Sequence, residues 1–200
     1  MNRFRLSEDG WAEGVVCIPS PNHDARAADT IPSLLVIHNI SLPPGQFGGP
    51  EIADLFCNRL DCDAHPYFDQ LRSLRVSAHF LIRRDGKVMQ FVSANDRAWH
   101  AGVSSFSGRE RCNDYSIGVE LEGTDFEPFD PRQYDALADL TQALRARYPL
   151  ADVAGHEHIA PGRKTDPGPY FDWGYYRKSL IQKEALAQAS LELRFPFMNE

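Results

Sequence analysis

The sequence predicts an α/β fold in which one mixed β-sheet is flanked by α-helices. Short apolar runs that are typical of buried strands alternate along the chain with segments of helical periodicity. The length of 200 residues and the hydrophobic content of 42% are those of one ordinary soluble domain with a sizeable core. Because no repeat, low-complexity segment or linker divides the chain, we expect a single domain over residues 1–200.

The charge and the N-terminus exclude several classes of protein. A net charge of −7 disfavours nucleic acid as a partner, because phosphate binding needs clustered Lys and Arg. No apolar segment follows the N-terminal arginines, and no window approaches 18 apolar residues, so neither a signal peptide nor a membrane span is expected. The four scattered cysteines are expected to be reduced thiols in a cytoplasmic protein, with two disulfides in an exported protein as the alternative.

The first strong element is the apolar run at 33–39, which is typical of a strand buried on both faces. His38 falls at its end, where a side chain can project into a cleft, although one such histidine is more often a core residue. The Pro/Gly-rich loop at 41–50 follows and could form one wall of a substrate groove. Residues 1–31 before the strand are polar and are expected to be irregular.

Two short helices and a β-hairpin come next. Pro50 and helically spaced apolar residues predict a helix at 51–58, and a second short helix is expected to open at 65–68. The β-rich runs 76–82 and 87–92 flank an Asp-Gly pair, which predicts a hairpin.

Histidine and tryptophan in this region have ordinary structural explanations. We expect His79, in the middle of a predicted strand, to be packed and hydrogen-bonded in the core. Trp99 lies in the segment R-A-W-H-A-G-V-S, 97–104, where a turn would expose it for stacking on a sugar or peptide. A tryptophan in the core is an equally good interpretation.

An acidic residue interrupts the apolar strand predicted at 115–121. Burial of Glu120 there would raise its pKa and make it a candidate general base. Alternation could instead place Glu120 in solvent. Glu122 would share its face, so the pattern does not decide between these possibilities.

The last third of the chain is predicted to hold two long helices and a loop. Asp130 and Pro131 begin a helix that extends to about Tyr148, and a short strand at 152–154 follows. A second helix is compatible with residues 172–193, and the tail after it is expected to be frayed or docked.

The loop at 153–169 contains two histidines, an acid, two bases and many Gly and Pro residues, which exclude regular structure through most of it. His38, His156 and Asp166 together would be a normal ligand set for a catalytic zinc ion, with the fourth position left to water. Their spacing is non-local and is by itself weakly specific. His158 is a rival ligand, because residues i and i+2 share one face of an extended segment.

Several long strings resemble one family of enzymes. They run in order from about residue 10 to 177 and comprise L-L-V-I-H-N-I-S-L-P-P-G-Q-F-G, H-P-Y-F, L-R-V-S-A-H-F-L-I-R-R-D-G, R-A-W-H-A-G-V-S, G-R-E-R-C-N-D-Y-S-I-G-V-E-L-E-G-T-D and G-H-x-x-I-A-P-x-R-K-T-D-P-G. The chain resembles the cytoplasmic 1,6-anhydro-N-acetylmuramyl-L-alanine amidases of the AmpD type, within the N-acetylmuramoyl-L-alanine amidase and peptidoglycan recognition protein superfamily. Residues 181–200 fall outside the resemblance and have no assigned role.

The resemblance implies a role for each of five residues. His38, His156 and Asp166 would bind Zn²⁺ at the bottom of a groove, Glu120 would be the catalytic base, and Lys164 would stabilise the transition state. The sequence departs from the family at Glu157-His158, where relatives carry a small residue followed by Asp or Asn, and this departure places His158 outside the ligand set.

The implied reaction is hydrolysis of the amide between the muramyl lactyl group and L-alanine during peptidoglycan recycling. A water molecule on zinc would be the nucleophile, with a soluble anhydro-muropeptide as substrate and no obligate protein partner. Candidate substrate-binding residues are Asn39, Tyr67, Arg75, Trp99 and Arg111. The alternatives are a non-catalytic peptidoglycan-binding module, which typically lacks a zinc ligand, and a lytic amidase that acts on intact wall.

Overall fold

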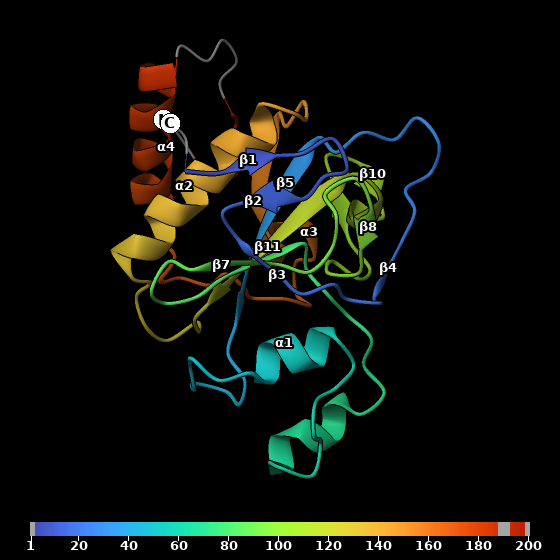
Figure 1. The fold of residues 1–200 in the computed structure, drawn as a ribbon. Helices are drawn as coiled ribbons and strands as arrows, with labels where there is room; N and C mark the ends of the chain where they lie inside the picture. The colour runs from blue at the N-terminus through green and yellow to red at the C-terminus, as the bar shows by residue number, and fades with distance from the viewer. Residues whose placement is uncertain (1–2, 188–192, 199–200) are drawn as a thin grey trace.

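The core of the molecule is a six-stranded sheet. A computed structural model describes residues 3–187 and 193–198 of the chain (Figure 1). The strand order is β12-β5-β11-β6-β7-β3, and the pairs are parallel except for the antiparallel β6–β7 pair. The strands are β3 (Val16–Cys17), β5 (Leu34–Ile40), β6 (Phe80–Ile82), β7 (Val88–Gln90), β11 (Ser116–Glu122) and β12 (Asp152–Gly155). The predicted α/β class with a mixed sheet is confirmed.

The register of the three parallel strands brings their carboxyl ends together. Glu120 on β11 pairs with His38 on β5, and Gly155 on β12 pairs with Ile37 on β5. Since β12 ends at Gly155, His156 leaves the sheet next to His38. Strand β5 is buried over Leu34–His38, as expected for a strand covered on both faces.

Helices cover the sheet on two sides (Figure 1). Helix α2 (Pro131–Arg145) begins at the capping box of Asp130 and Gln133 and packs against α4 (Trp173–Ala187). Helix α1 (Glu51–Phe56) and the 3₁₀ helix η1 (Pro66–Leu71) lie on another side, where their buried apolar residues share a core cluster with Leu81 of β6. All four were predicted; of the last helix, expected at 172–193, residues 188–192 lie outside the described residues, and Leu193 is not helical.

The hairpin and its histidine agree with the sequence predictions. Strands β6 and β7 pair around a turn in which Gly86 has φ of 78°, as the Asp-Gly pair indicated. His79 is fully buried; its Nδ1 accepts the N–H of Gly118, and its Nε2 lies 3.0 Å from the carbonyl oxygen of Asp96. It is the packed core histidine that was expected.

The smaller elements include one correction. Residues 1–31 were expected to be irregular, but they contain β1 (Arg5–Leu6), β2 (Ala12–Glu13), β3 and β4 (His23–Asp24), and β3 forms an edge of the main sheet. Strands of two residues are too short to leave a periodic pattern. The remaining elements are β8 (Arg97–Ala98), β9 (Ser105–Phe106), β10 (Arg109–Glu110), η2 (Cys112–Asp114) and α3 (His156–Ile159). No helix in the described part of the chain combines the length and apolar character that crossing a bilayer requires.

Glu122 connects the sheet to the loop at 41–50. Its carboxylate is 1% exposed and accepts hydrogen bonds from the Gly48 N–H at 2.6 Å, the Arg83 guanidinium at 2.9 Å and the Arg84 N–H at 3.1 Å. The loop and the hairpin are therefore both held by one buried acid at the end of β11.

We expect Glu122→Gln to lower the free energy of unfolding by about 3 kcal/mol, because a buried ion pair is broken and the Arg83 charge is left without its partner. Urea unfolding measures this loss. The matched control is Glu13→Gln, which changes an exposed acid on β2 and should stay within about 0.5 kcal/mol of the wild type. Equal stabilities of the two variants would show that the Glu122 ion pair contributes nothing.

Candidate functional site

Three side chains converge at the carboxyl end of the parallel strands. Nδ1 of His38 lies 3.0 Å from Nδ1 of His156, and each of these nitrogens lies 3.0 Å from Oδ2 of Asp166. His38 ends the buried part of β5, His156 begins α3, and Asp166 comes from the loop that follows. The three atoms form a nearly equilateral triangle, an arrangement that could hold a metal ion.

The donor set fits zinc. Two imidazole nitrogens and one carboxylate oxygen are ligands that catalytic zinc sites use. A tetrahedron with bonds of about 2.1 Å has edges of about 3.4 Å, close to the separation of these atoms. The three residues leave one tetrahedral position for water or substrate, which is the coordination of a catalytic rather than a structural site.

The protonation states of His38 and Asp166 also suit metal binding. Burial lowers the pKa of His38 to about 4, so its imidazole is neutral at physiological pH. Burial alone would raise the pKa of Asp166, but hydrogen bonds from His156 and His38 hold it below the ordinary value. A neutral imidazole and an ionised carboxylate are the forms that bind a metal.

Glu120 lies beside this cluster. Burial, and then the Asp166 charge, raise its pKa well above the ordinary value of 4.5, while the Lys164 charge acts in the opposite direction. Its Oε2 atom is inaccessible to solvent and has no hydrogen-bond partner among the described residues. Because a buried polar atom is normally satisfied, an orphaned carboxylate oxygen next to three metal-binding groups indicates a place for a water molecule or substrate atom.

A groove opens beside Asp166 of the cluster. It is lined by Asn39 of β5, by Ser41, Pro44 and Gly45 after that strand, by Tyr67 of η1, by residues 124–127 after β11, and by residues 163–166. Its lining thus includes the candidate ligand Asp166, the candidate catalytic Lys164, and two of the candidate substrate-binding residues. The loop at 41–50 forms one wall, as the sequence predicted.

Asn39 is held so that only its oxygen remains available. Its Nδ2 donates to Oδ1 of Asp125 at 2.6 Å and to the carbonyl of Pro167 at 2.9 Å. These partners are acceptors, so they use both amide donors of Asn39. A ligand in the groove would therefore meet an acceptor at this position.

Three other candidate substrate-binding residues do not line the groove. Arg75 is exposed and donates to the carbonyls of Arg72 and Leu74. Arg111 is exposed and pairs with Asp114 at 3.0 Å. Trp99 is half-buried, which is intermediate between the exposed and core interpretations. Their roles in binding stay predictions.

The reason given for considering His158 a rival ligand was wrong. The backbone at 156–159 is a helical turn rather than an extended segment, so His156 and His158 project in different directions. His158 accepts the Gly155 N–H on Nδ1 at 2.8 Å and stacks on Phe197 with ring centroids 3.8 Å apart. It is a packing residue outside the cluster, and the C-terminal tail at 193–198 is docked against it.

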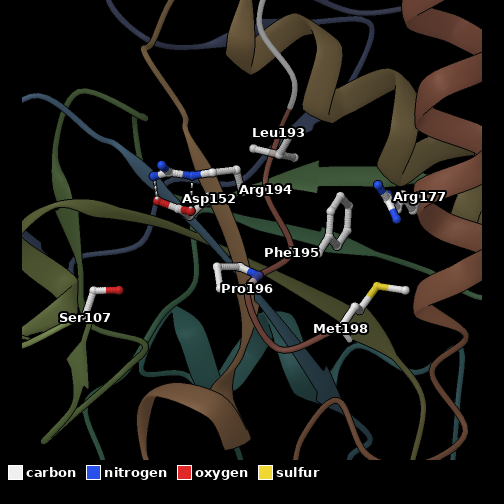
Figure 2. Close-up of a pocket in the computed structure, with 8 residues that line it drawn as sticks. All are labelled: Ser107, Asp152, Arg177, Leu193, Arg194, Phe195, Pro196 and Met198. Atoms are coloured by element: carbon white, nitrogen blue, oxygen red, sulfur yellow. Dashed lines mark hydrogen bonds and ion pairs between the residues drawn. The ribbon is translucent and has the colours of Figure 1, made fainter. Parts of the chain in front are cut away.

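The tail also lines a second pocket (Figure 2). Asp152 accepts two hydrogen bonds from Arg194 there, at 2.8 and 2.7 Å. None of the candidate ligands or catalytic residues is among its lining residues. We therefore place the candidate site in the groove.

One neighbour of the cluster had no role in the sequence predictions. Nδ1 of His100 lies 2.9 Å from Nε2 of His38, on the side of the ring that faces away from the other ligands. The only signal in the sequence was a further histidine next to Trp99.

Comparisons with known proteins agree on one family. Residues 28–169 match the model of the N-acetylmuramoyl-L-alanine amidase family. The chain is 56% identical over 181 residues to the 1,6-anhydro-N-acetylmuramyl-L-alanine amidase AmpD of Escherichia coli (strain K12), covering 90% of this chain and 98% of that protein. It is 58% identical over 174 residues to AmpD of Citrobacter freundii, covering 86% and 93% of the two chains.

Solved structures show the same relationship. A crystal structure of a selenomethionine AmpD derivative matches with a TM-score of 0.85 and 57% identity, over 88% of this chain and 99% of that chain. AmiD of E. coli, solved as a complex with the substrate anhydro-N-acetylmuramic acid-L-Ala-D-gamma-Glu-L-Lys, matches with a TM-score of 0.56 and 29% identity, over 87% of this chain and 65% of that chain.

Proposed function

The chain belongs to the N-acetylmuramoyl-L-alanine amidase family, and from that premise we propose that it is a zinc-dependent amidase of soluble 1,6-anhydro-N-acetylmuramyl peptides. The observation that carries the metal dependence is the triangle of His38 Nδ1, His156 Nδ1 and Asp166 Oδ2. The high identity to AmpD over nearly the whole of those relatives supports the substrate. The same reaction would place the protein in peptidoglycan recycling.

His38, His156 and Asp166 would hold the zinc ion. When bound, zinc supplies a Lewis acid that acidifies water and polarises a carbonyl group. The bond that breaks joins the lactyl carbonyl carbon to the nitrogen of L-alanine. Water supplies a hydroxyl to the carbon and a proton to the nitrogen, so the products are a carboxylate and a free amine.

Glu120 and Lys164 would do the remaining chemistry. The Glu120 carboxylate, whose Oε2 has no other partner among the described residues, would take a proton from the attacking water and deliver it to the leaving amine. Lys164 is exposed at the groove and would place its ammonium near the developing oxyanion. Removal of one such donor typically slows catalysis by about 10²–10³-fold.

The groove would bind the sugar and the peptide. Asn39 offers only its oxygen, so it would accept a hydrogen bond from an amide N–H or hydroxyl of the substrate. Tyr67 of η1 is 40% exposed and lies in the same lining, where its ring can pack against a sugar or peptide.

Removal of the metal tests this function. We expect the purified protein to release free peptide from 1,6-anhydro-N-acetylmuramyl tripeptide, and we expect a zinc chelator to abolish this release, because the proposed reaction needs the ion. Chromatography of the products measures it. Addition of zinc in excess over the chelator should restore the activity. Release that is unaffected by the chelator would refute the zinc dependence.

The same assay distinguishes the rival functions. A non-catalytic binding module would bind the muropeptide without releasing peptide. A lytic amidase would cleave intact peptidoglycan as fast as the soluble substrate, whereas we expect a clear preference for the soluble one. The cytoplasmic location stays a prediction that cell fractionation would test.

A further inference from the structure

The two histidines of the triangle each present a second nitrogen to one short segment, His100-Ala101. Nε2 of His38 lies 2.9 Å from Nδ1 of His100. Nε2 of His156 lies 3.0 Å from the carbonyl oxygen of Ala101. Adjacent residues of one loop thus contact both imidazoles on the sides that face away from Asp166.

The tautomers follow from these contacts. An imidazole that binds a metal through Nδ1 carries its proton on Nε2. The carbonyl of Ala101 can only accept a hydrogen bond, so it selects this tautomer of His156. Nδ1 of His100 selects the same tautomer of His38 when the His100 proton is on Nε2. Nε2 of His100 lies 3.1 Å from the hydroxyl oxygen of Ser116.

The fold holds this segment firmly. Oδ1 of Asn113 accepts the backbone N–H groups of His100 at 3.2 Å and Ala101 at 2.8 Å. The Arg163 guanidinium donates to the Ala101 carbonyl at 2.6 Å. The segment is fixed from two directions before any ligand arrives.

Strand β11 also leaves room for the His100 ring. A Cβ atom at Gly118 would stand 2.5 Å from both Cγ and Nδ1 of His100, which is closer than real Cβ contacts. Glycine at this strand position therefore lets the ring approach the backbone closely, with Nδ1 near His38 and Nε2 near Ser116.

We propose that His100 and the Ala101 carbonyl are positioning groups that orient the two histidine ligands and select their metal-binding tautomers. This inference rests on the proposed zinc site and concerns groups outside the ligand set. Partners of this kind typically contribute about 10–100-fold to metal affinity.

Two amide variants separate the two ends of the His100 ring. The Asn side chain can place Oδ1 where Nδ1 of histidine lies, so His100→Asn keeps an acceptor for His38. The Gln side chain can place its terminal group where Nε2 lies, so His100→Gln keeps the contact with Ser116 and loses the acceptor for His38. Both variants replace the imidazole ring by a neutral polar amide. They therefore differ only in which ring nitrogen the amide group replaces.

The measurement is the affinity of the metal-free protein for Zn²⁺, by competition with a chromophoric chelator. We expect His100→Gln to lose about 10–100-fold in affinity and His100→Asn to recover most of it. The visible spectrum of the Co²⁺-loaded protein should change in the Gln variant more than in the Asn variant. The unfolding temperatures of the two metal-free variants should be similar, because no bound ion contributes to the stability of either one.

Gly118→Ala provides an independent test. The added methyl group would displace the His100 ring, so Zn²⁺ affinity should fall as it does for His100→Gln. Wild-type affinity in His100→Gln, or equal losses in the Gln and Asn variants, would overturn the inference. Failure of the wild-type protein to bind Zn²⁺ would instead refute the proposed function.

Discussion

Replacement of Glu120 by Gln should reduce kcat by about 10²–10⁴-fold, the usual contribution of a general acid–base group. Glutamine has nearly the same shape but cannot take up a proton at neutral pH. Because Glu120 is outside the ligand triangle, the variant should still bind one zinc ion per chain. Peptide release under single-turnover conditions and metal analysis of the same sample measure the two effects.

The conservative control is Glu127→Gln, which removes a carboxylate from the lining of the same groove. We expect a much smaller loss of kcat there. Loss of zinc from Glu120→Gln would make Glu120 a ligand instead of the base, and wild-type turnover would remove it from the mechanism.

The raised pKa of Glu120 also has a stability consequence with a definite sign. Between 4.5 and the higher pKa of the folded state, the folded metal-free protein keeps a proton that the unfolded chain has lost. Stability therefore falls as pH rises through this window. The stability of metal-free Glu120→Gln should not fall over this pH range. At pH values above the range, its unfolding temperature should therefore exceed that of the metal-free wild type. Parallel pH profiles of the two proteins would contradict the burial effect.

The second large effect is expected from Asp166→Ala. Residues that only hydrogen-bond to a metal ligand contribute up to roughly 100-fold to metal affinity. Loss of one of three ligands should lower zinc affinity by more than this. Peptide release at limiting free zinc should therefore be lost. Competition with a chromophoric chelator measures the affinity directly.

Asp125→Asn is the matched control, since Asp125 is a groove acid outside the ligand triangle. It should bind zinc as the wild type does. Unchanged zinc affinity in Asp166→Ala would remove Asp166 from the ligand set, and equal losses in both variants would indicate a general electrostatic effect of the groove.

The sequence predicted those candidate site residues that lie in a buried strand or directly after one. Apolar runs located β5 and β11, with His38 near the end of one and Glu120 inside the other, and the strand expected at 152–154 leads directly to His156. Parallel strands bring such ends to one edge of a sheet, so the general place of the site could be predicted.

The same reasoning could not distinguish Glu120 from Glu122. Both lie on one face of β11, and their environments depend on residues from elsewhere in the chain. Arg83 and Gly48 satisfy Glu122, while nothing described satisfies Oε2 of Glu120. Such long-range partners leave no local signal in the sequence.

Local conformation and loop contacts caused the other differences. His158 lies in a helical turn that the Gly- and Pro-rich composition around it concealed. His100 was overlooked because its significance comes from Nε2 of His38, which is 62 positions away. Arg75 and Arg111 are not among the residues that line the groove, so their roles in binding stay predictions.

The wide separation of the three proposed ligands along the chain would give a bound zinc ion a second effect. His38 is 118 positions from His156 and 128 from Asp166. A bound ion acts as a reversible cross-link across a long loop, and the entropy of closing that loop makes the unfolded chain a poor ligand. Nearly all of the binding free energy then stabilises the folded protein. The supply of zinc in the cell would therefore govern how long each molecule survives proteolysis, as well as how fast it works.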